Sequence, residues 1–197
     1  MEKAAKKSMR AEARKLLLGL PAGQRATASA EICRRIGELP EWSAARTVGL
    51  YAAQSTEPNL ATMLEATGKK FCFPRVCGEL LEFYRCDSMA ALRAGKWGVM
   101  EPDPELCELM PAEEIDLIAV PGMAFTRGGG RLGRGGGYYD RFLLRVHPQR
   151  AVKVGVCFQA QLVDVLPLES HDHEVAVLVT EAGIIRCSTG LTSGALM

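Results

Sequence analysis

Apolar residues recur at helical spacing in the first part of the chain. The spacing predicts a helix over residues 3–20 that buries one stripe and exposes a basic side. A second helix is predicted over residues 22–38, because Pro21 suits a helix start and Pro40 ends the pattern. The buried stripe of the first helix consists of Met9, Ala13, Leu16, Leu17 and Leu20.

After residue 46 the pattern changes to short apolar runs, which are typical of buried strands. Short helices are expected between some of them, and a Pro-rich crossing with little regular structure is expected near Trp97. The predicted strands are residues 47–52, 70–74, 80–86, 115–120, 153–158 and 175–179, with an edge strand at 183–187. The predicted helices are residues 58–67, 89–94 and 136–146, and the crossing is residues 95–111.

Strands that alternate with helices predict an α/β fold, with an open, largely parallel sheet flanked by helices. A chain of 197 residues, of which 48% are hydrophobic, is long enough for one such domain. We therefore expect a single domain over residues 1–197, with a frayed tail at 190–197. In open sheets of this kind, ligands bind outside the carboxyl ends of the strands.

The net charge of the chain is only +1, so the molecule has no general field for nucleic acid or an anionic membrane. No stretch approaches the roughly 20 apolar residues of a membrane span, and no apolar segment of a signal peptide follows the basic N-terminus. We expect a soluble, cytoplasmic chain whose basic residues act where they cluster.

The seven cysteines are odd in number, widely spread and without a C-x-x-C pair. Neither a zinc site nor a disulfide framework is therefore expected. Most of them lie in strand patterns, as Cys72 and Cys157 do, and are predicted to be small core residues.

The most informative segment follows the apolar run at 115–120. Between Arg127 and Gly137 it holds seven glycines and three arginines. Glycine lets backbone N–H groups approach an anion closely, and Arg131 and Arg134 can donate paired hydrogen bonds to phosphate oxygens. The spacing matches neither a Walker A motif nor a dinucleotide fingerprint. A flexible linker is disfavoured because a strand and a helix frame the segment, so we predict a phosphate-binding loop.

Two acidic residues near this loop have two open interpretations each. Asp140 lies in the first turn of the following helix, where it can bind Mg²⁺ through one oxygen or merely favour the helix dipole. Glu57 follows the first strand at its carboxyl end, where it can accept hydrogen bonds from a ligand ring or help to cap the next helix.

Three further groups of residues have an ordinary structural role as the alternative to a functional one. Lys6, Arg10 and Arg14 share one face of the first helix, which is usually a solvated face. Neighbouring residues in 171–174 point to opposite sides of an extended segment, so they cannot all bind one metal ion. The aromatic residues Trp97, Tyr138 and Tyr139 can stack on a planar ring, although core packing is their commoner use.

The residues also resemble a known family. The segments from Pro121 to Phe125 and from Gly130 to Asp140 are similar to the signature of 5-formyltetrahydrofolate cyclo-ligases, also called methenyltetrahydrofolate synthetases. The resemblance covers nearly the whole chain and implies a Rossmann-like, three-layer α/β fold. It also implies closure of 5-formyltetrahydrofolate to 5,10-methenyltetrahydrofolate with ATP and Mg²⁺. Further matches are Lys6-Lys7-Ser8-Met9-Arg10, Glu57, Phe73-Pro74-Arg75-Val76, Glu101-Pro102, Gln161, Pro167 and His171-Asp172.

The resemblance assigns roles residue by residue. It implies that Arg134 and Lys6 act in catalysis and that Asp140 and Asp172 bind the metal. One departure is Ala176, where the family often has a second aspartate. The implied ATP-binding residues are Lys6, Lys7, Arg10, Arg131, Leu132, Gly133, Arg134, Gly135, Gly136, Gly137, Tyr138 and Tyr139. The implied residues for the folate are Glu57, Ala52, Arg134, Gly135, Gly136, Gly137 and Tyr138.

Two other functions compete with this one. Arginine, glycine and tyrosine also alternate in proteins that bind single-stranded RNA, although the near-neutral charge and the short tract argue against that class. The second competing function is that of a family member that binds its ligands without turnover. The joint presence of Lys6, Glu57, Arg134 and Asp140 argues against it. We expect a monomer whose partners are the small molecules ATP and 5-formyltetrahydrofolate.

Overall fold

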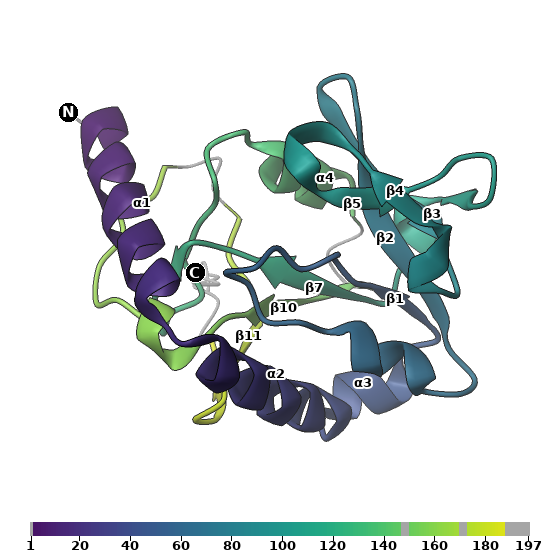
Figure 1. The fold of residues 1–197 in the computed structure, drawn as a ribbon, viewed down its shortest axis with the longest axis horizontal. Coiled ribbons are helices and arrows are strands. Elements are labelled where there is room, and N and C mark those ends of the chain that lie inside the picture. Colours follow the sequence, from purple (N-terminus) through teal and green to yellow (C-terminus); the bar gives the residue numbers. More distant parts are fainter. Residues whose placement is uncertain (1, 147–149, 170–172, 188–197) are drawn as a thin grey trace, which may run out of the picture.

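The computed structural model describes residues 2–146, 150–169 and 173–187. Its centre is an eight-stranded sheet with the order β12-β11-β10-β7-β1-β2-β3-β6 (Figure 1). The five strands from β11 to β2 run parallel, whereas β12, β3 and β6 each pair antiparallel with their neighbour. The predicted open, largely parallel sheet is thus confirmed. The strands are β1 Thr47–Gly49, β2 Lys70–Cys77, β3 Leu80–Arg85, β6 Glu108–Met110, β7 Leu117–Pro121, β10 Val152–Val156, β11 Val177–Val179 and β12 Ile184–Arg186.

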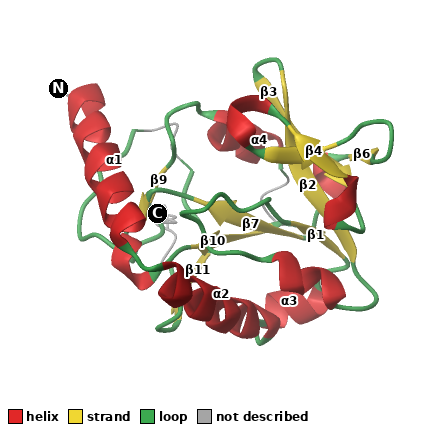
Figure 2. Ribbon diagram, in the orientation of Figure 1, coloured by secondary structure: helices red, strands yellow, loops and turns green. Residues whose placement is uncertain are grey.

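Helices cover both faces of the sheet (Figure 2). Helices α2 (Ala22–Gly37) and α3 (Pro40–Ala44) lie on one face, and α4 (Tyr138–Arg145) lies on the other. Helix α1 (Glu2–Gly19) extends along the side of the molecule, with its first turns away from the sheet (Figure 1). The predicted three-layer architecture is therefore confirmed.

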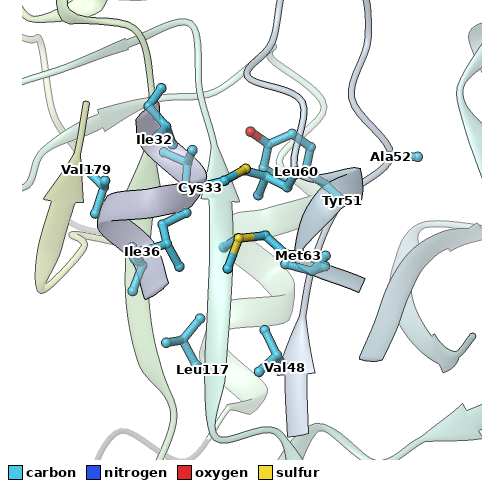
Figure 3. Close-up of a cluster of buried hydrophobic side chains, with 14 of the residues drawn as sticks. Ile32, Cys33, Ile36, Val48, Tyr51, Ala52, Leu60, Met63, Leu117 and Val179 are labelled. Atoms are coloured by element: carbon cyan, nitrogen blue, oxygen red, sulfur yellow. The ribbon is translucent and has the colours of Figure 1, made fainter. Parts of the chain in front are cut away.

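Successive side chains of β7 point to opposite faces of the sheet and so belong to two separate layers of the core. Leu117 packs with α2 and α3, whereas the next residue, Ile118, packs with α4 on the opposite face. Figure 3 shows the first layer, in which Ile32 and Ile36 of α2 lie beside Val179 and Leu117. Each fully buried side chain of this size contributes roughly 1.5–3 kcal/mol by leaving water.

Gly155 in β10 leaves no room for a side chain. A Cβ atom there would lie 2.6 Å from Leu178 Cδ2 and 2.9 Å from Val175 Cγ2. We expect Gly155→Ala to lower the free energy of unfolding by about 1–3 kcal/mol because it overpacks the core. Chemical denaturation measures the change, and Gly183→Ala, whose Cβ would meet no atom within 4 Å, is the matched control. Equal stability of the two variants would contradict this view of the core.

Two predicted helices are wrong or shortened. Residues 58–67 form only a 3₁₀-helix, η1 (Ala61–Glu65), because the buried residues Leu60 and Met63 are three positions apart and suit three residues per turn. Residues 89–94 divide into a 3₁₀ turn, η2 (Met89–Ala91), and a short strand, β4 (Leu92–Ala94). Helix α3 was not predicted; it begins at Pro40, the residue expected only to end α2.

The segment 95–111 has more regular structure than predicted. It contains a 3₁₀ turn, η3 (Lys96–Gly98), and strand β5 (Met100–Pro102), which forms a hairpin with β4. It also contributes β6 to the main sheet through pairing with β3. These strands are too short to show a period, and β6 becomes a neighbour of its pairing partner β3 only in the fold.

The cysteines are mainly core residues, as predicted, with one exception. Cys86 and Cys107 form a disulfide across 21 residues, with Cα atoms 5.5 Å apart. The pair joins the end of β3 to the segment before β6. Sequence spacing could not indicate it, because the fold alone brings the two residues together.

Candidate active site

The candidate site lies where the order of the sheet reverses. Strand β1 pairs with β2 on one side and with β7 on the other, so the chain leaves β1 in one direction and returns on its opposite side. Such a switch point opens a crevice at the carboxyl ends of the strands. A cavity of about 650 Å³ occupies it. Its walls come from the segments after β1 (51–57) and β7 (121–123), the glycine loop with the start of α4 (131–140), the β4–β5 hairpin, and α1.

The glycine loop is a folded part of this wall. A hairpin of β8 (Ala124–Phe125) and β9 (Arg131–Leu132) opens it, and α4 follows it. Gly135 and Gly137 have φ angles of +104° and +67°, which residues with a side chain rarely adopt. Arg131 in the loop is buried. The loop is therefore not a flexible linker, and one of its three arginines, Arg131, lies in the interior instead of facing solvent.

Arg131 anchors the loop to α4. Its guanidinium forms a close ion pair with Asp140 and donates to the carbonyl oxygen of Pro121 at 3.2 Å. It also lies 5.8 Å from the centre of the Tyr139 ring. Arg131 Nε and the Tyr139 hydroxyl are buried without a hydrogen-bond partner among the described residues. Two donors beside the cavity are thus available to a ligand or to water.

Arg134 extends across the cavity to Glu57. Its Nη2 and Nε lie 2.8 and 3.1 Å from Glu57 Oε1, while the other carboxylate oxygen accepts from the backbone N–H of Gln54 at 2.9 Å. The Glu57 side chain is only 8% exposed, whereas Arg134 is 43% exposed. The loop after β1 therefore holds a buried carboxylate inside the cavity, and the partly exposed Arg134 guanidinium covers it.

Helix α1 reaches the loop through its basic face. Arg10 Nε donates to the carbonyl oxygen of Gly133 at 2.8 Å, and the cavity also touches Arg14. Lys6 is buried and forms an ion pair with Glu169 at 3.0 Å. The interpretation that it lies on a solvated helix face is therefore wrong. Lys7 is exposed on α1, and Lys6, Lys7 and Arg10 do not line the cavity itself.

Other predicted residues divide between wall and core. Ala52, Gly133, Gly136, Gly137 and Tyr138 line the cavity, whereas Leu132 is buried in β9. The ring centres of Trp97 and Tyr138 are 5.9 Å apart, and both residues line the cavity. Burial raises the pKa of Tyr139 far above its usual value, so its hydroxyl stays protonated.

For a metal ion the structure offers one suitable oxygen. Asp140 lines the cavity, and Arg131 engages only its Oδ1 atom, so Oδ2 is left for a hard cation such as Mg²⁺. Asp172 and His171 lie outside the described residues. Among the residues that are described, no three His, Cys, Asp or Glu side chains cluster around a metal position. Mg²⁺ fits such a site because it usually keeps waters and binds substrate phosphates.

Several wall residues were not predicted as site residues. Tyr51 follows β1 and donates to the carbonyl oxygen of Pro58 at 2.9 Å, which holds the loop that carries Glu57. Gln161 supports the turn after β7 by donating to the carbonyl oxygen of Gly122 at 2.8 Å. Glu101 of β5 is a third carboxylate in the cavity, and burial raises its pKa. Only the short Glu101-Pro102 match hinted at it in the sequence.

The fold and the cavity define an α/β protein with a candidate ligand site that is lined by arginines and carboxylates at the switch point of an open sheet. No described helix is long and apolar enough to cross a membrane. The chain belongs to the 5-formyltetrahydrofolate cyclo-ligase family, whose family model matches residues 2–181. It is therefore a ligase-type enzyme, as the resemblance implied.

Relatives of known name are similar over most of the chain. A Schizosaccharomyces pombe protein named probable 5-formyltetrahydrofolate cyclo-ligase is 32% identical over 80% of this chain and 86% of its own. The Haemophilus influenzae 5-formyltetrahydrofolate cyclo-ligase is 28% identical over 85% and 92%. The solved structure of Aquifex aeolicus 5,10-methenyltetrahydrofolate synthetase is 35% identical, covers 98% of this chain and 95% of its own, and has a TM-score of 0.81.

Proposed function

We propose that this enzyme closes 5-formyltetrahydrofolate to 5,10-methenyltetrahydrofolate with consumption of ATP. The main observation in support of this proposal is that Arg131, Arg134 and the buried Glu57 line one cavity. Guanidinium groups and glycine N–H groups suit phosphate, and a buried carboxylate suits the N–H donors of a pterin ring. Both kinds of ligand can therefore lie next to each other.

The chemistry needs phosphorylation before ring closure. The formyl group on N5 is an amide, so its oxygen is a poor leaving group. In the proposed reaction the formyl oxygen attacks the γ-phosphorus of ATP and ADP leaves. N10 then attacks the activated carbon, and phosphate departs with the oxygen to leave the methenyl bridge. Arg131 and Arg134 would stabilise the charge on the transferred group, with Lys6 and Arg10 of α1 on the side of the loop facing that helix.

Other residues would orient the two substrates. Glu57 would exchange Arg134 for the pterin, which frees Arg134 to meet the phosphoryl group. Tyr138 and Ala52 would contact the folate, and the loop from Gly133 to Gly137 would surround the triphosphate. Positioning of this kind supplies much of the acceleration in phosphoryl transfer.

Mg²⁺ would be held by Asp140, together with Asp172 and the phosphates. When bound, it neutralises charge on the phosphate oxygens during transfer. The same site leads us to propose ATP and the folate as the binding partners of the protein. We propose no nucleic-acid or membrane partner. The single domain, the monomeric state and the cytoplasmic location remain predictions.

Product formation tests this proposal directly. We expect the purified protein, mixed with 5-formyltetrahydrofolate and MgATP, to produce the strong near-ultraviolet absorption of the methenyl product and one ADP for each product molecule. Omission of ATP should abolish the signal, and chelation of Mg²⁺ with EDTA should lower it at least about tenfold, with recovery when Mg²⁺ is restored in excess. Absence of product in the complete mixture would refute the function.

A further inference from the structure

The reaction just proposed releases a proton that none of the assigned residues accepts. When N10 attacks the activated carbon, the N10–C bond forms while N10 still carries its hydrogen. That proton must leave before N5 can expel phosphate to complete the methenyl bridge. A base positioned in the cavity can receive this proton, and proton transfer to a positioned side chain typically accelerates such a step about 10²- to 10⁴-fold.

Three carboxylates line the cavity, and two of them are held by guanidinium groups. Glu57 pairs with Arg134, and Asp140 pairs with Arg131. Glu101 is 5% exposed and forms no ion pair among the described residues. A carboxylate bound to a guanidinium is a weak base, whereas a buried carboxylate without such a partner is a stronger one.

The β4–β5 hairpin holds Glu101 in the wall of the cavity. Strand β5, which carries it, packs on β2, where Arg75 Nη1 donates to the carbonyl oxygen of Pro102 at 2.6 Å. Gly95 directly follows the opposite strand of the hairpin, and a Cβ atom there would overlap the Glu101 carboxylate. Between these strands the turn carries Trp97, which lies beside Tyr138 of α4. The hairpin thus extends from β2 to the start of α4.

We propose that Glu101 is the catalytic base that accepts the N10 proton during ring closure. This inference rests on the function proposed above. The N10–H bond breaks, its electron pair stays on N10, and the proton moves to a carboxylate oxygen of Glu101. The N5 lone pair then expels phosphate with the electrons of the C–O bond. Glu101 passes its proton to the departing phosphate or to solvent and returns to the carboxylate.

The surroundings of Glu101 suit this task. Burial raises its pKa, and this effect exceeds the opposing influence of the Val76 backbone N–H, of Arg75 on β2 and of Lys96 in the turn. A base acts in its deprotonated form, so activity should fall as the pH drops through this pKa. The acid limb of the kcat profile should therefore begin at a higher pH than the usual Glu value of about 4.3 allows.

Single-turnover kinetics of Glu101→Gln test the proposal, because the two chemical steps can be followed separately. We expect ADP to form at the wild-type rate in the first turnover, while the methenyl absorption appears about 100-fold more slowly. The acid limb of the wild-type kcat profile should also disappear. A residue that merely shapes the cavity or binds folate would slow both steps together.

Controls separate this inference from the function on which it rests. Glu105→Gln, an exposed carboxylate in the same segment, should behave as wild type in both steps. If Glu101→Gln does not fold, Glu101→Asp decides, since it keeps the carboxylate one methylene farther from the cavity and should slow ring closure without slowing ADP formation. Normal ring closure, or equal slowing of both steps, overturns the role of Glu101 while wild-type turnover leaves the function intact. Absence of wild-type turnover overturns both.

Discussion

Replacement of Arg131 by alanine should lower the free energy of unfolding by about 3–5 kcal/mol and abolish measurable turnover. Its side chain is 3% exposed, and its ion pair with Asp140 is shielded from solvent. Removal of one partner of such a pair leaves a poorly solvated charge, which costs more than the pair itself contributes. The substitution also removes the bond that holds the loop to the carbonyl oxygen of Pro121. Chemical denaturation and the methenyl assay measure the two effects.

Arg127→Ala is the matched control, because Arg127 belongs to the same glycine-rich segment but is exposed. It should change stability by less than about 0.5 kcal/mol. Asp140→Asn tests the same pair from the other side, and we expect it to lose part of the stability that Arg131→Ala loses. If Arg131→Ala unfolds at the wild-type denaturant concentration, the buried pair does not stabilise the loop.

Replacement of Arg134 by alanine should lower kcat/KM about 100- to 1000-fold with little effect on stability. Loss of a preorganised charge at the transferred group costs roughly 2.7–4 kcal/mol of transition-state stabilisation. In contrast, the Arg134–Glu57 pair is open to solvent on the arginine side, with 43% of that side chain exposed. Such pairs contribute at most about 1 kcal/mol to folding. Turnover and denaturation midpoints, measured on the same preparation, separate the two effects.

A double-mutant cycle with Glu57→Gln sharpens this prediction. Glu57→Gln alone should mainly raise KM for the folate, because the pterin ring loses a charged hydrogen-bond acceptor. Arg134, the cation proposed to contact the phosphate, remains in this variant. The two substitutions should be non-additive, since the residues are in contact in the ligand-free protein. Near-normal turnover of Arg134→Ala would exclude its part in phosphoryl transfer, whatever the cycle shows.

The fold could be predicted largely from local patterns. The buried runs at 115–120 and 153–158 are continuous and apolar, which is the pattern of strands covered on both faces, and they became β7 and β10. The helix predicted over residues 22–38 likewise became α2. Predictions were wrong for the three-residue strands of the β4–β5 hairpin, and for β6, whose pairing partner β3 is distant in the sequence.

The candidate site likewise has features that the sequence predicts and features that depend on the fold. The glycine loop was visible because its composition serves backbone conformations that only glycine adopts easily, as at Gly135 and Gly137. The pairing of Arg134 with Glu57 joins residues 77 positions apart, and no local pattern contains that information. The position of Glu101 in the same cavity likewise depends on the fold of the hairpin.

By itself, the sequence determined which residue types are present and in which local conformations they are stable: an α/β alternation, a glycine-rich loop after a buried strand, and a basic first helix. The tertiary structure decided which charges meet. It buried Lys6 beside Glu169, paired Arg131 with Asp140, and left Glu101 buried without an ion pair among the described residues. Periodicity is a property of neighbouring residues, whereas the strength of a charge depends on burial and on partners that only folding brings near.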